Sequence, residues 1–190
     1  MGFVLRTERL EISPLAESDL EAFVAYRRDP DVARYQSWLP DYSLADARSL
    51  LAAQPGTTLP ETGGWVQLAL RPISASYGST LIGDVAIGTD AVQPDTYELG
   101  VTLAPAHQGQ GFAREALAAV LEALFAAHGA HRIVMQGDAR NASVLRLLRH
   151  LGLRHEGTVL EGDWFKGEWS TLERFAVLDR EWPSSPPRLS

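Results

Sequence analysis

Apolar residues recur along the chain with two different periods, and these periods predict its strands and helices. Residues 97–103 carry apolar side chains at every second position, which predicts a strand. Residues 113–125 carry them at helical spacing, and Gly129 is a typical stop. Pro105, which cannot donate to a strand ladder, lies between the two segments. The pattern therefore predicts a strand, a Gly-rich turn and a helix in succession.

The same periods predict the remaining elements, and turn residues separate them. Further helices are expected from Ser18, as part of a capping box, to before Pro30, from Ser43 to Ala53 and from Asn141 to Leu151, with a helical turn at 31–35. Further strands are expected at 5–12, 65–70, 81–87, 131–136, 158–160 and 171–178. The order shows no internal repeat and no linker. It predicts one α/β domain over residues 1–182 and a disordered tail at 183–190.

Composition narrows the class of protein. The 190 residues suffice for one domain with a sizeable core, and the absence of cysteine excludes disulfides, thiolate metal sites and a cysteine nucleophile. A net charge of −7 argues against nucleic acid as the main partner and suits an amine-bearing one. No apolar run reaches the roughly 18 residues of a membrane span, and no secretory signal is visible. We therefore expect a cytoplasmic protein with no membrane partner.

The turn Gln108-Gly109-Gln110-Gly111-Phe112-Ala113 is the strongest chemical signal in the chain. The first N–H groups of a helix have no partner within the helix, and the helix dipole adds partial positive charge there. Glycine lets a bound group approach the backbone closely. The turn thus predicts a phosphate or pyrophosphate cradle, with a simple connection that binds nothing as the alternative. It is neither a Walker loop, since no Gly-Lys-Ser/Thr follows, nor a Rossmann turn, since position 114 is Arg.

The Gln-x-x-Gly-x-Ala pattern of this turn, after a strand that ends in Leu-Ala-Pro, resembles the acetyl-CoA signature of the GCN5-related N-acetyltransferases (GNAT). The resemblance extends from Arg6-Thr7-Glu8-Arg9-Leu10 to Glu181-Trp182 and is closest to the branch of ribosomal-protein-alanine N-acetyltransferases. It implies a mixed, mostly antiparallel, seven-stranded sheet with helices on both faces. It also implies that the strands carrying Leu103 and Met135 splay apart to admit the co-substrate acetyl-CoA.

The resemblance further implies which residues hold acetyl-CoA. The pyrophosphate is expected among Gln108, Gly109, Gly111, Phe112, Ala113 and Arg114. The backbone of Leu103 is expected to meet the pantetheine arm or the thioester carbonyl, where an N–H also stabilises an oxyanion. Asn141 matches a family asparagine that contacts the pantetheine or the helix start. A simple helix N-cap is the alternative role for Asn141.

Acetyl transfer needs a neutral amine, and Glu98 is the leading candidate for the base that deprotonates it. Glu98 lies on the central strand and points to the face opposite Leu99; an ordinary ion-paired glutamate is the alternative. The general acid is less defined. Many relatives place a tyrosine where this chain has Leu148, and the ribosomal-type branch tends to place a serine where it has Val144. Ser143 or solvent remains as the proton donor to the departing thiolate.

The acceptor amine is expected between the N-terminal helices and the last hairpin. The aromatic residues expected to line this cleft are Tyr35, Trp38, Trp164, Phe165 and Trp169, with ordinary core packing as the alternative. The loop 54–64 is a candidate lid, and the five histidines show no metal-ligand pattern. Thr171 stands where relatives often carry an aspartate, which weakens any transfer of specificity.

Two functions follow from this sequence. The first is transfer of an acetyl group from acetyl-CoA to a primary amine, either a protein N-terminus or a small molecule such as a polyamine, an amino acid or an aminoglycoside. The second is a non-catalytic acyl-CoA-binding sensor domain. In either case we expect a monomer or homodimer that needs no metal.

Overall fold

The computed structural model describes residues 3–55, 59–60, 62–74 and 81–183 of the chain. The predicted disordered tail lies outside the described residues except for Pro183. The candidate lid at 54–64 and the connection after Ser74 are described only in part.

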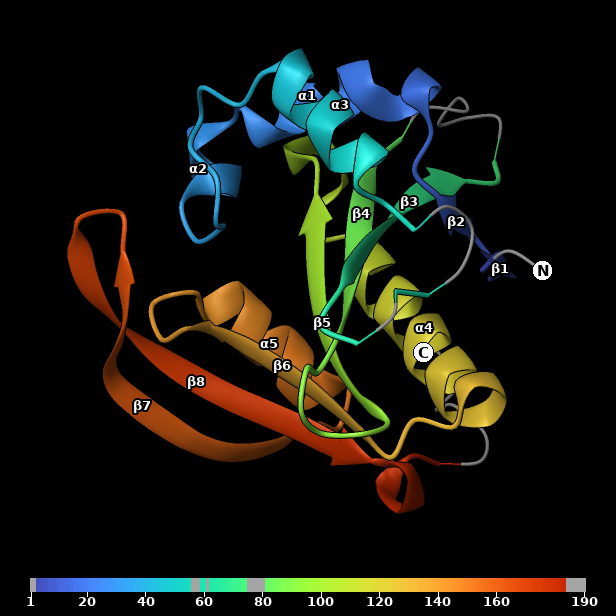
Figure 1. Cartoon of the computed structure of the whole chain (residues 1–190), viewed down its shortest axis with the longest axis vertical. Coiled ribbons are helices and arrows are strands. Elements are labelled where there is room, and N and C mark those ends of the chain that lie inside the picture. Colours follow the sequence, from blue (N-terminus) through green and yellow to red (C-terminus); the bar gives the residue numbers. More distant parts are fainter. Residues whose placement is uncertain (1–2, 56–58, 61, 75–80, 184–190) are drawn as a thin grey trace.

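The described residues build one eight-stranded sheet in the order β1-β2-β3-β4-β5-β6-β8-β7 (Figure 1). All neighbours are antiparallel except β5 and β6, which are parallel. The strands are β1 (Leu5–Arg6), β2 (Leu10–Pro14), β3 (Trp65–Pro72), β4 (Gly83–Thr89), β5 (Thr96–Leu103), β6 (Arg132–Asp138), β7 (Arg154–Phe165) and β8 (Glu168–Leu178). The predicted mixed, mostly antiparallel fold class is confirmed.

The sheet has eight strands instead of the predicted seven because residues 5–12 do not form one strand. The chain turns back after β1, where the Thr7 N–H donates to the Leu10 carbonyl at 2.9 Å, and β2 then pairs with β1. The last hairpin is also much longer than predicted. Strand β7 carries a bulge between Val159 and Asp163, which interrupts the alternation on which the prediction relied.

Helices cover both faces of the sheet. They are α1 (Leu20–Arg27), α2 (Pro30–Ala33), α3 (Leu44–Ala52), α4 (Phe112–His128) and α5 (Ala142–His150), with 3-10 turns at Glu17–Asp19, Pro105–His107 and Asp179–Glu181. The predicted cap at Ser43 is confirmed, since its Oγ accepts from the Asp46 N–H. The predicted cap at Ser18 is wrong. Ser18 lies inside a 3-10 turn, and Asp19 accepts from the Ala16 N–H instead.

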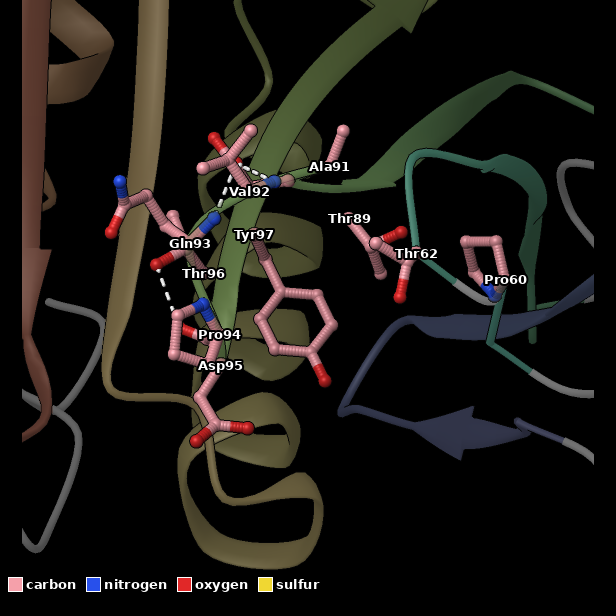
Figure 2. A pocket seen from close by; sticks show the side chains of 11 residues that line it. Pro60, Thr62, Thr89, Ala91, Val92, Gln93, Pro94, Asp95, Thr96 and Tyr97 are labelled. Carbon is pink, nitrogen blue, oxygen red and sulfur yellow. Dashed lines mark hydrogen bonds between the residues drawn. The ribbon is translucent and has the colours of Figure 1, made fainter.

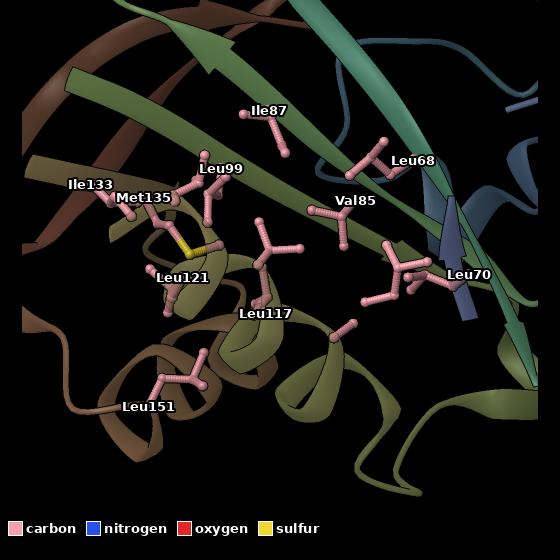
Figure 3. Packing of buried hydrophobic residues seen from close by; sticks show 14 of the residues in the cluster. Leu68, Leu70, Val85, Ile87, Leu99, Leu117, Leu121, Ile133, Met135 and Leu151 are labelled. Atoms are coloured by element: carbon pink, nitrogen blue, oxygen red, sulfur yellow. The ribbon is translucent and has the colours of Figure 1, made fainter. Parts of the chain in front are cut away.

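The main core lies between one face of the sheet and helices α4 and α5. Figure 3 shows Leu117 and Leu121 of α4 packed among strand residues such as Val85 and Leu99, all of which are buried. A second core on the opposite face holds Phe23 and other residues of α1 and α3. Apolar positions one helical turn apart place one stripe of each helix on the sheet, and α4 packs directly on β5.

The central strands β5 and β6 pair over three residues only, Thr96–Glu98 with Arg132–Val134. Beyond Glu98, β5 stays paired with β4 and β6 stays paired with β8, so the two strands diverge. We call this divergence the fork. It confirms the predicted splay of the strands that carry Leu103 and Met135.

Candidate functional site

A cavity of about 680 Å³ opens at the fork. The end of β5, the Gly-rich turn, the start of α5 and the segment after α2 enclose it. Its lining residues are Asp31, Val32, Arg34, Tyr35, Gln36, Val101, Thr102, Leu103, Gln108, Gly109, Gly111, Ala113, Arg114, Asn141, Ser143, Val144, Arg146, Leu147 and His150. The sequence-predicted residues Leu103, Gln108, Gly109, Gly111, Ala113, Arg114, Asn141, Ser143 and Tyr35 therefore meet in one place.

The Gly-rich turn has the backbone that a cradle requires. Gly109 and Gly111 have φ angles of 72° and 83°, in the left-handed region that favours glycine. Gly111 is the N-cap of α4, and no side chain caps the helix there. Gly111 thus offers no capping side chain at the start of α4, and the partial positive charge of a helix start favours a bound anion.

Two glutamine side chains hold the turn in shape. The Gln108 Nε2 donates to the Leu103 carbonyl at 3.0 Å, and the Gln110 Nε2 donates to the Ala106 carbonyl at 2.8 Å. Gln108 therefore ties the turn to the end of β5. Phe112, by contrast, is 1% exposed, and its ring packs in the main core, so only its backbone is placed to face a ligand.

Arginine side chains lie in several walls of the cavity. Arg114 of α4 and Arg146 of α5 line it, and Arg34 lines it after α2, where it pairs with Asp31 at 2.6 Å. A cavity with cationic walls at a helix start attracts a multiply charged anion. The electrostatics therefore favour a ligand with several phosphate groups.

The edge of β5 that faces the fork offers backbone groups to a ligand. The Ala104 N–H donates to Ile82, its neighbour before β4, at 2.9 Å. Along an antiparallel pair, residues that bond to the partner strand alternate with residues that do not. Leu103, which comes before Ala104, therefore directs its N–H away from β4 and toward the fork. The parallel pairing with β6 has already ended at Glu98. An extended ligand with amide groups fits such an edge.

Glu98 lies where the fork begins, on the face opposite Leu99. Its carboxylate accepts from the Gln136 Nε2 at 3.2 Å and is half-buried. Burial raises the pKa of Glu98 above its ordinary value, while the Gln136 hydrogen bond and the charge of Arg174 act against that rise. Glu98 does not line the cavity itself, but Val101 of the same strand does. A carboxyl group with a raised pKa, on the strand whose end lines the cavity, suits a proton acceptor.

The start of α5 places Asn141 and Ser143 at the cavity. The Asn141 Oδ1 accepts from the Val144 N–H at 3.2 Å, so Asn141 is the N-cap of α5, and it also lines the cavity. Ser143 is exposed on the first turn. Leu148, at the position of the family tyrosine, is fully buried in the main core. A leucine side chain has no proton to donate, so this position supplies no general acid.

The predicted acceptor aromatics do not gather around one cleft. Tyr35 lines the cavity. Trp38 instead stacks on the buried Arg27 guanidinium at 3.7 Å and donates its Nε1 hydrogen to the Arg27 carbonyl. Trp164 and Trp169 are 60% and 57% exposed and contact each other edge-to-face across the projecting β7–β8 hairpin, away from the cavity lining (Figure 1). Their predicted role in substrate binding has no contact with the cavity to support it.

The tip of the β7–β8 hairpin nevertheless contacts α2, on the side where the acceptor amine is expected. The Lys166 Nζ donates to the Ala33 carbonyl of α2 at 2.5 Å, and Lys166 lies near the ring of Phe165. The Tyr35 hydroxyl donates to the Arg140 carbonyl at 3.5 Å. These contacts bridge the segment after α2 to the β6–α5 loop and to the hairpin.

A family model described as an acetyltransferase (GNAT) domain matches residues 9–154, well over half of the sequence. The chain belongs to the GNAT acetyltransferase family. It is an acyl-CoA-dependent N-acetyltransferase, which confirms the predicted family and enzyme class.

Three relatives illustrate the match. The uncharacterized N-acetyltransferase YnaD of Bacillus subtilis (strain 168) is 26% identical over 180 residues, which cover 94% of this acetyltransferase and 98% of YnaD. The structure of spermidine N-acetyltransferase from Vibrio cholerae with CoA and spermine superposes with a TM-score of 0.78 at 20% identity, covering 92% and 98% of the two chains. Mycobacterium smegmatis RimJ with CoA-disulfide gives 0.79 at 19% identity, covering 93% and 85%. The two structures show that the fold is shared.

A second pocket of this acetyltransferase, of about 550 Å³, lies at the other end of β5 (Figure 2). It is formed by the β4–β5 turn and by Pro60 and Thr62. Asp90 accepts from the Val92 and Gln93 N–H groups at 2.7 and 2.8 Å, so its carboxylate stabilises the turn. The pocket is remote from the Gly-rich turn, and nothing in it points to a ligand.

Three residues of α5 that line the cavity were not predicted, namely Arg146, Leu147 and His150. They lie three, four and seven positions after the predicted residue Ser143, so all four share one face of the helix, and this spacing is visible in the sequence. Asp31 of α2 and Gln36 after it also line the cavity, but their place depends on long-range packing and has no such signal. Within the described residues, no helix is long and apolar enough to cross a bilayer, and no three His, Asp or Glu side chains cluster to hold a metal ion.

Proposed function

We propose that this acetyltransferase moves an acetyl group from acetyl-CoA to a primary amine, which belongs either to a protein N-terminus or to a small molecule. The observation that carries the proposal is the cavity at the fork. It joins an uncapped helix start, arginine side chains in its walls and the edge of β5 that is no longer paired with β6. The first two features suit the pyrophosphate of acetyl-CoA and the strand edge suits its pantetheine arm, and Glu98 lies on the same strand three residues before the lining residue Val101.

The residues that would hold acetyl-CoA follow from this match. The backbone of Gly109, Gly111 and Ala113 would face the pyrophosphate, with Arg114 and Arg146 beside it. A methyl group added at Gly109 meets no other atom within 4 Å, so the space in front of this residue is open. The fork edge of β5 at Leu103 would meet the pantetheine amides, and Asn141 lies across from it. Two of the solved neighbours contain CoA or CoA-disulfide, which supports CoA as the class of ligand.

In the proposed reaction the acceptor ammonium first loses a proton to the Glu98 carboxylate. The neutral nitrogen attacks the thioester carbonyl carbon and then gives up a second proton to solvent, the carbon–sulfur bond breaks, and CoA leaves as a thiolate that takes up a proton. The Leu103 N–H would stabilise the oxyanion of the tetrahedral intermediate. Burial supports Glu98 as the base, since a raised pKa brings a carboxylate closer to neutral pH and strengthens it as a proton acceptor.

The proton for the thiolate would come from Ser143 or from solvent. Ser143 is exposed and lines the cavity two residues after Asn141, whereas Leu148 has no proton to donate. Either source leaves the reaction balanced: the ammonium gives up two protons, the thiolate takes up one, one is released to solvent, and Ser143 would recover from solvent any proton that it donates.

The acceptor would approach between α2 and the β7–β8 hairpin, on the face where Glu98 lies. Tyr35 is the aromatic residue best placed to contact it. The Vibrio cholerae neighbour, crystallised with spermine, makes a polyamine one acceptor class to test, and the ribosomal-type resemblance makes a peptide N-terminus the other. We further propose that the protein acts in the cytoplasm, as a monomer or homodimer built on a single domain over residues 1–182.

The test measures thiol release from acetyl-CoA with alanine- and serine-starting peptides, polyamines, amino acids and an aminoglycoside. Release with one class, and its loss in Glu98→Gln with unchanged acetyl-CoA affinity, is the expected result. Wild-type turnover in Glu98→Gln would remove Glu98 from the mechanism. Tight acetyl-CoA binding without release to any amine would favour the alternative, a non-catalytic acyl-CoA sensor.

A further inference from the structure

One buried carboxylate joins the N-terminal strands to the helix of the Gly-rich turn. Glu115, in the first turn of α4, has a side chain only 2% exposed. It accepts from the Thr7 hydroxyl at 2.6 Å, the Arg9 N–H at 2.9 Å and the Arg9 Nε at 2.6 Å, and its Oε2 lies 2.6 Å from the Arg9 Nη2. Thr7 and Arg9 belong to the Arg6–Leu10 motif, which the catalytic scheme leaves without a role. The motif thus fixes one arginine against one helix start.

Arg9 also reaches the Gly-rich turn directly. Its Nη1 donates to the Gln110 carbonyl at 2.9 Å, and its guanidinium lies over the Phe112 ring at 4.5 Å from the centroid. A Cβ at Gly111 would lie 3.3 Å from the Arg9 Nη2. Gly109 and Gly111 line the cavity and Arg9 does not. Arg9 therefore supports the turn from the side away from the ligand.

The hydrogen bond to Gln110 sets the direction of one peptide group. The Gln110 carbonyl and the Gly111 N–H belong to the same trans peptide, which is planar, so the two point in opposite directions. Holding the carbonyl on Arg9 turns the N–H away from Arg9, toward the cavity. If this peptide rotated, its carbonyl oxygen would face the anion instead and repel it. Glycine at position 111 makes such a rotation easy unless something prevents it.

We propose that Arg9 is a positioning residue for the cofactor, and that it fixes the Gln110–Gly111 peptide so that its N–H faces the pyrophosphate of the acyl-CoA. Glu115 and Thr7 hold Arg9 in turn. The inference rests on the proposed function in one respect, that the turn binds pyrophosphate. It assigns Arg9 no contact with the substrate.

A purely structural role would give Arg9 the simpler task of tying β1 and β2 to α4. Two donors separate the roles, acetyl-CoA and S-acetyl-pantetheine, which carries the same thioester without the pyrophosphate. If Arg9 only ties the strands to α4, its loss would lower kcat/KM for both donors equally or would lower only the stability of the protein. If Arg9 orients the peptide, its loss would lower kcat/KM only for acetyl-CoA, the donor that has a pyrophosphate.

The experiment compares Arg9→Met with wild type and with the matched control Arg71→Met. Arg71 also pairs with a buried carboxylate, that of Asp19, and donates to the Ser13 hydroxyl, but on the other face of the sheet. In Arg9→Met, kcat/KM for acetyl-CoA and the CoA affinity in calorimetry should fall about tenfold, as loss of one charge-assisted hydrogen bond implies. The kcat/KM for S-acetyl-pantetheine and the KM of the acceptor should not change. Arg71→Met should leave these four quantities unchanged.

Arg9→Lys serves if Arg9→Met does not fold. Lysine keeps a charge beside Glu115, but its single ammonium lacks the planar fork that spans Glu115 and the Gln110 carbonyl at once. It should fold as wild type does and still lose CoA affinity selectively. Equal losses for both donors, or unchanged CoA affinity in the Arg9 variants, would overturn the inference. Failure of wild type to bind CoA would instead refute the proposed function, so the two failures are distinguishable.

Discussion

The buried ion pair between Arg27 of α1 and Asp84 of β4 provides the sharpest test of how the second core is held. Both side chains are 3% exposed, with the Nη2 3.3 Å from one carboxylate oxygen. The Tyr26 hydroxyl donates to the same carboxylate at 2.5 Å. Phe23 and Trp38 lie on the guanidinium at 3.9 and 3.7 Å. Asp84→Asn keeps the shape but leaves the arginine charge without a counter-charge.

The expected cost follows from that burial. Removing one partner of a buried pair leaves an uncompensated charge, which costs about 3–5 kcal/mol in free energy of unfolding. The aromatic contacts remain and offset only part of the loss. Glu17→Gln is the control, because its pair with Arg48 is about 60% exposed on both sides and such pairs contribute about 0–1 kcal/mol.

Urea unfolding followed by tryptophan fluorescence measures both variants, and an unchanged m-value shows that the unfolding reaction is the same. The double variant Arg27→Met with Asp84→Asn should be more stable than Asp84→Asn alone, since it removes the stranded charge. A cost below about 1 kcal/mol for Asp84→Asn, in the range of exposed pairs, would refute the reasoning. So would a double variant whose cost is the sum of its two parts.

Three further predictions concern activity. The charge of Arg174 lowers the pKa of Glu98, so its removal in Arg174→Met should raise that pKa. Because the base acts when deprotonated, the acidic limb of the pH profile of kcat/KM should then move to higher pH. The limb should stay in place in the control Arg149→Met, whose arginine packs on the other side of β8. Gly109→Ala places a Cβ on a left-handed backbone, which costs about 1 kcal/mol of stability. The KM for acetyl-CoA should rise, while the KM for the acceptor should not change. An unchanged KM for acetyl-CoA would contradict the proposed pyrophosphate cradle. Ser143→Ala should lower kcat if its hydroxyl donates the proton, and an unchanged kcat together with a solvent isotope effect like that of wild type would assign the donor to solvent.

Local signals in the sequence were sufficient for the Gly-rich turn and for the elements around it. The period-two run of β5, the helical stripe of α4 and Gly129 depend on neighbours within a few residues, and each is found where predicted. The cap at Asn141 belongs to the same class. Such signals are encoded by local backbone preferences and by burial of one face.

The remaining features depend on residues that are distant in the sequence. No local pattern distinguishes Glu115 within its helix, yet it is buried and bound by Arg9, 106 positions away. Trp38 reads as a substrate aromatic, but a buried arginine needed a ring to cover it. Phe112 sits in the signature turn and still packs in the core, because the first residue of α4 points inward. A periodic pattern of apolar residues carries no information about contacts between residues that are far apart in the sequence.

The short pairing of β5 with β6 has a mechanical consequence. Three residue pairs join strands β1–β5 to strands β6–β8, so the ladder at the centre of the sheet is shorter than every other ladder except that of the two-residue strand β1. The main core, which packs residues of both halves together, therefore carries much of the connection between them. A ligand that fills the fork and bonds to both strands adds a further link there, and its binding free energy adds to the stability of the folded protein. Donor occupancy and the stability of the sheet around the fork are therefore coupled.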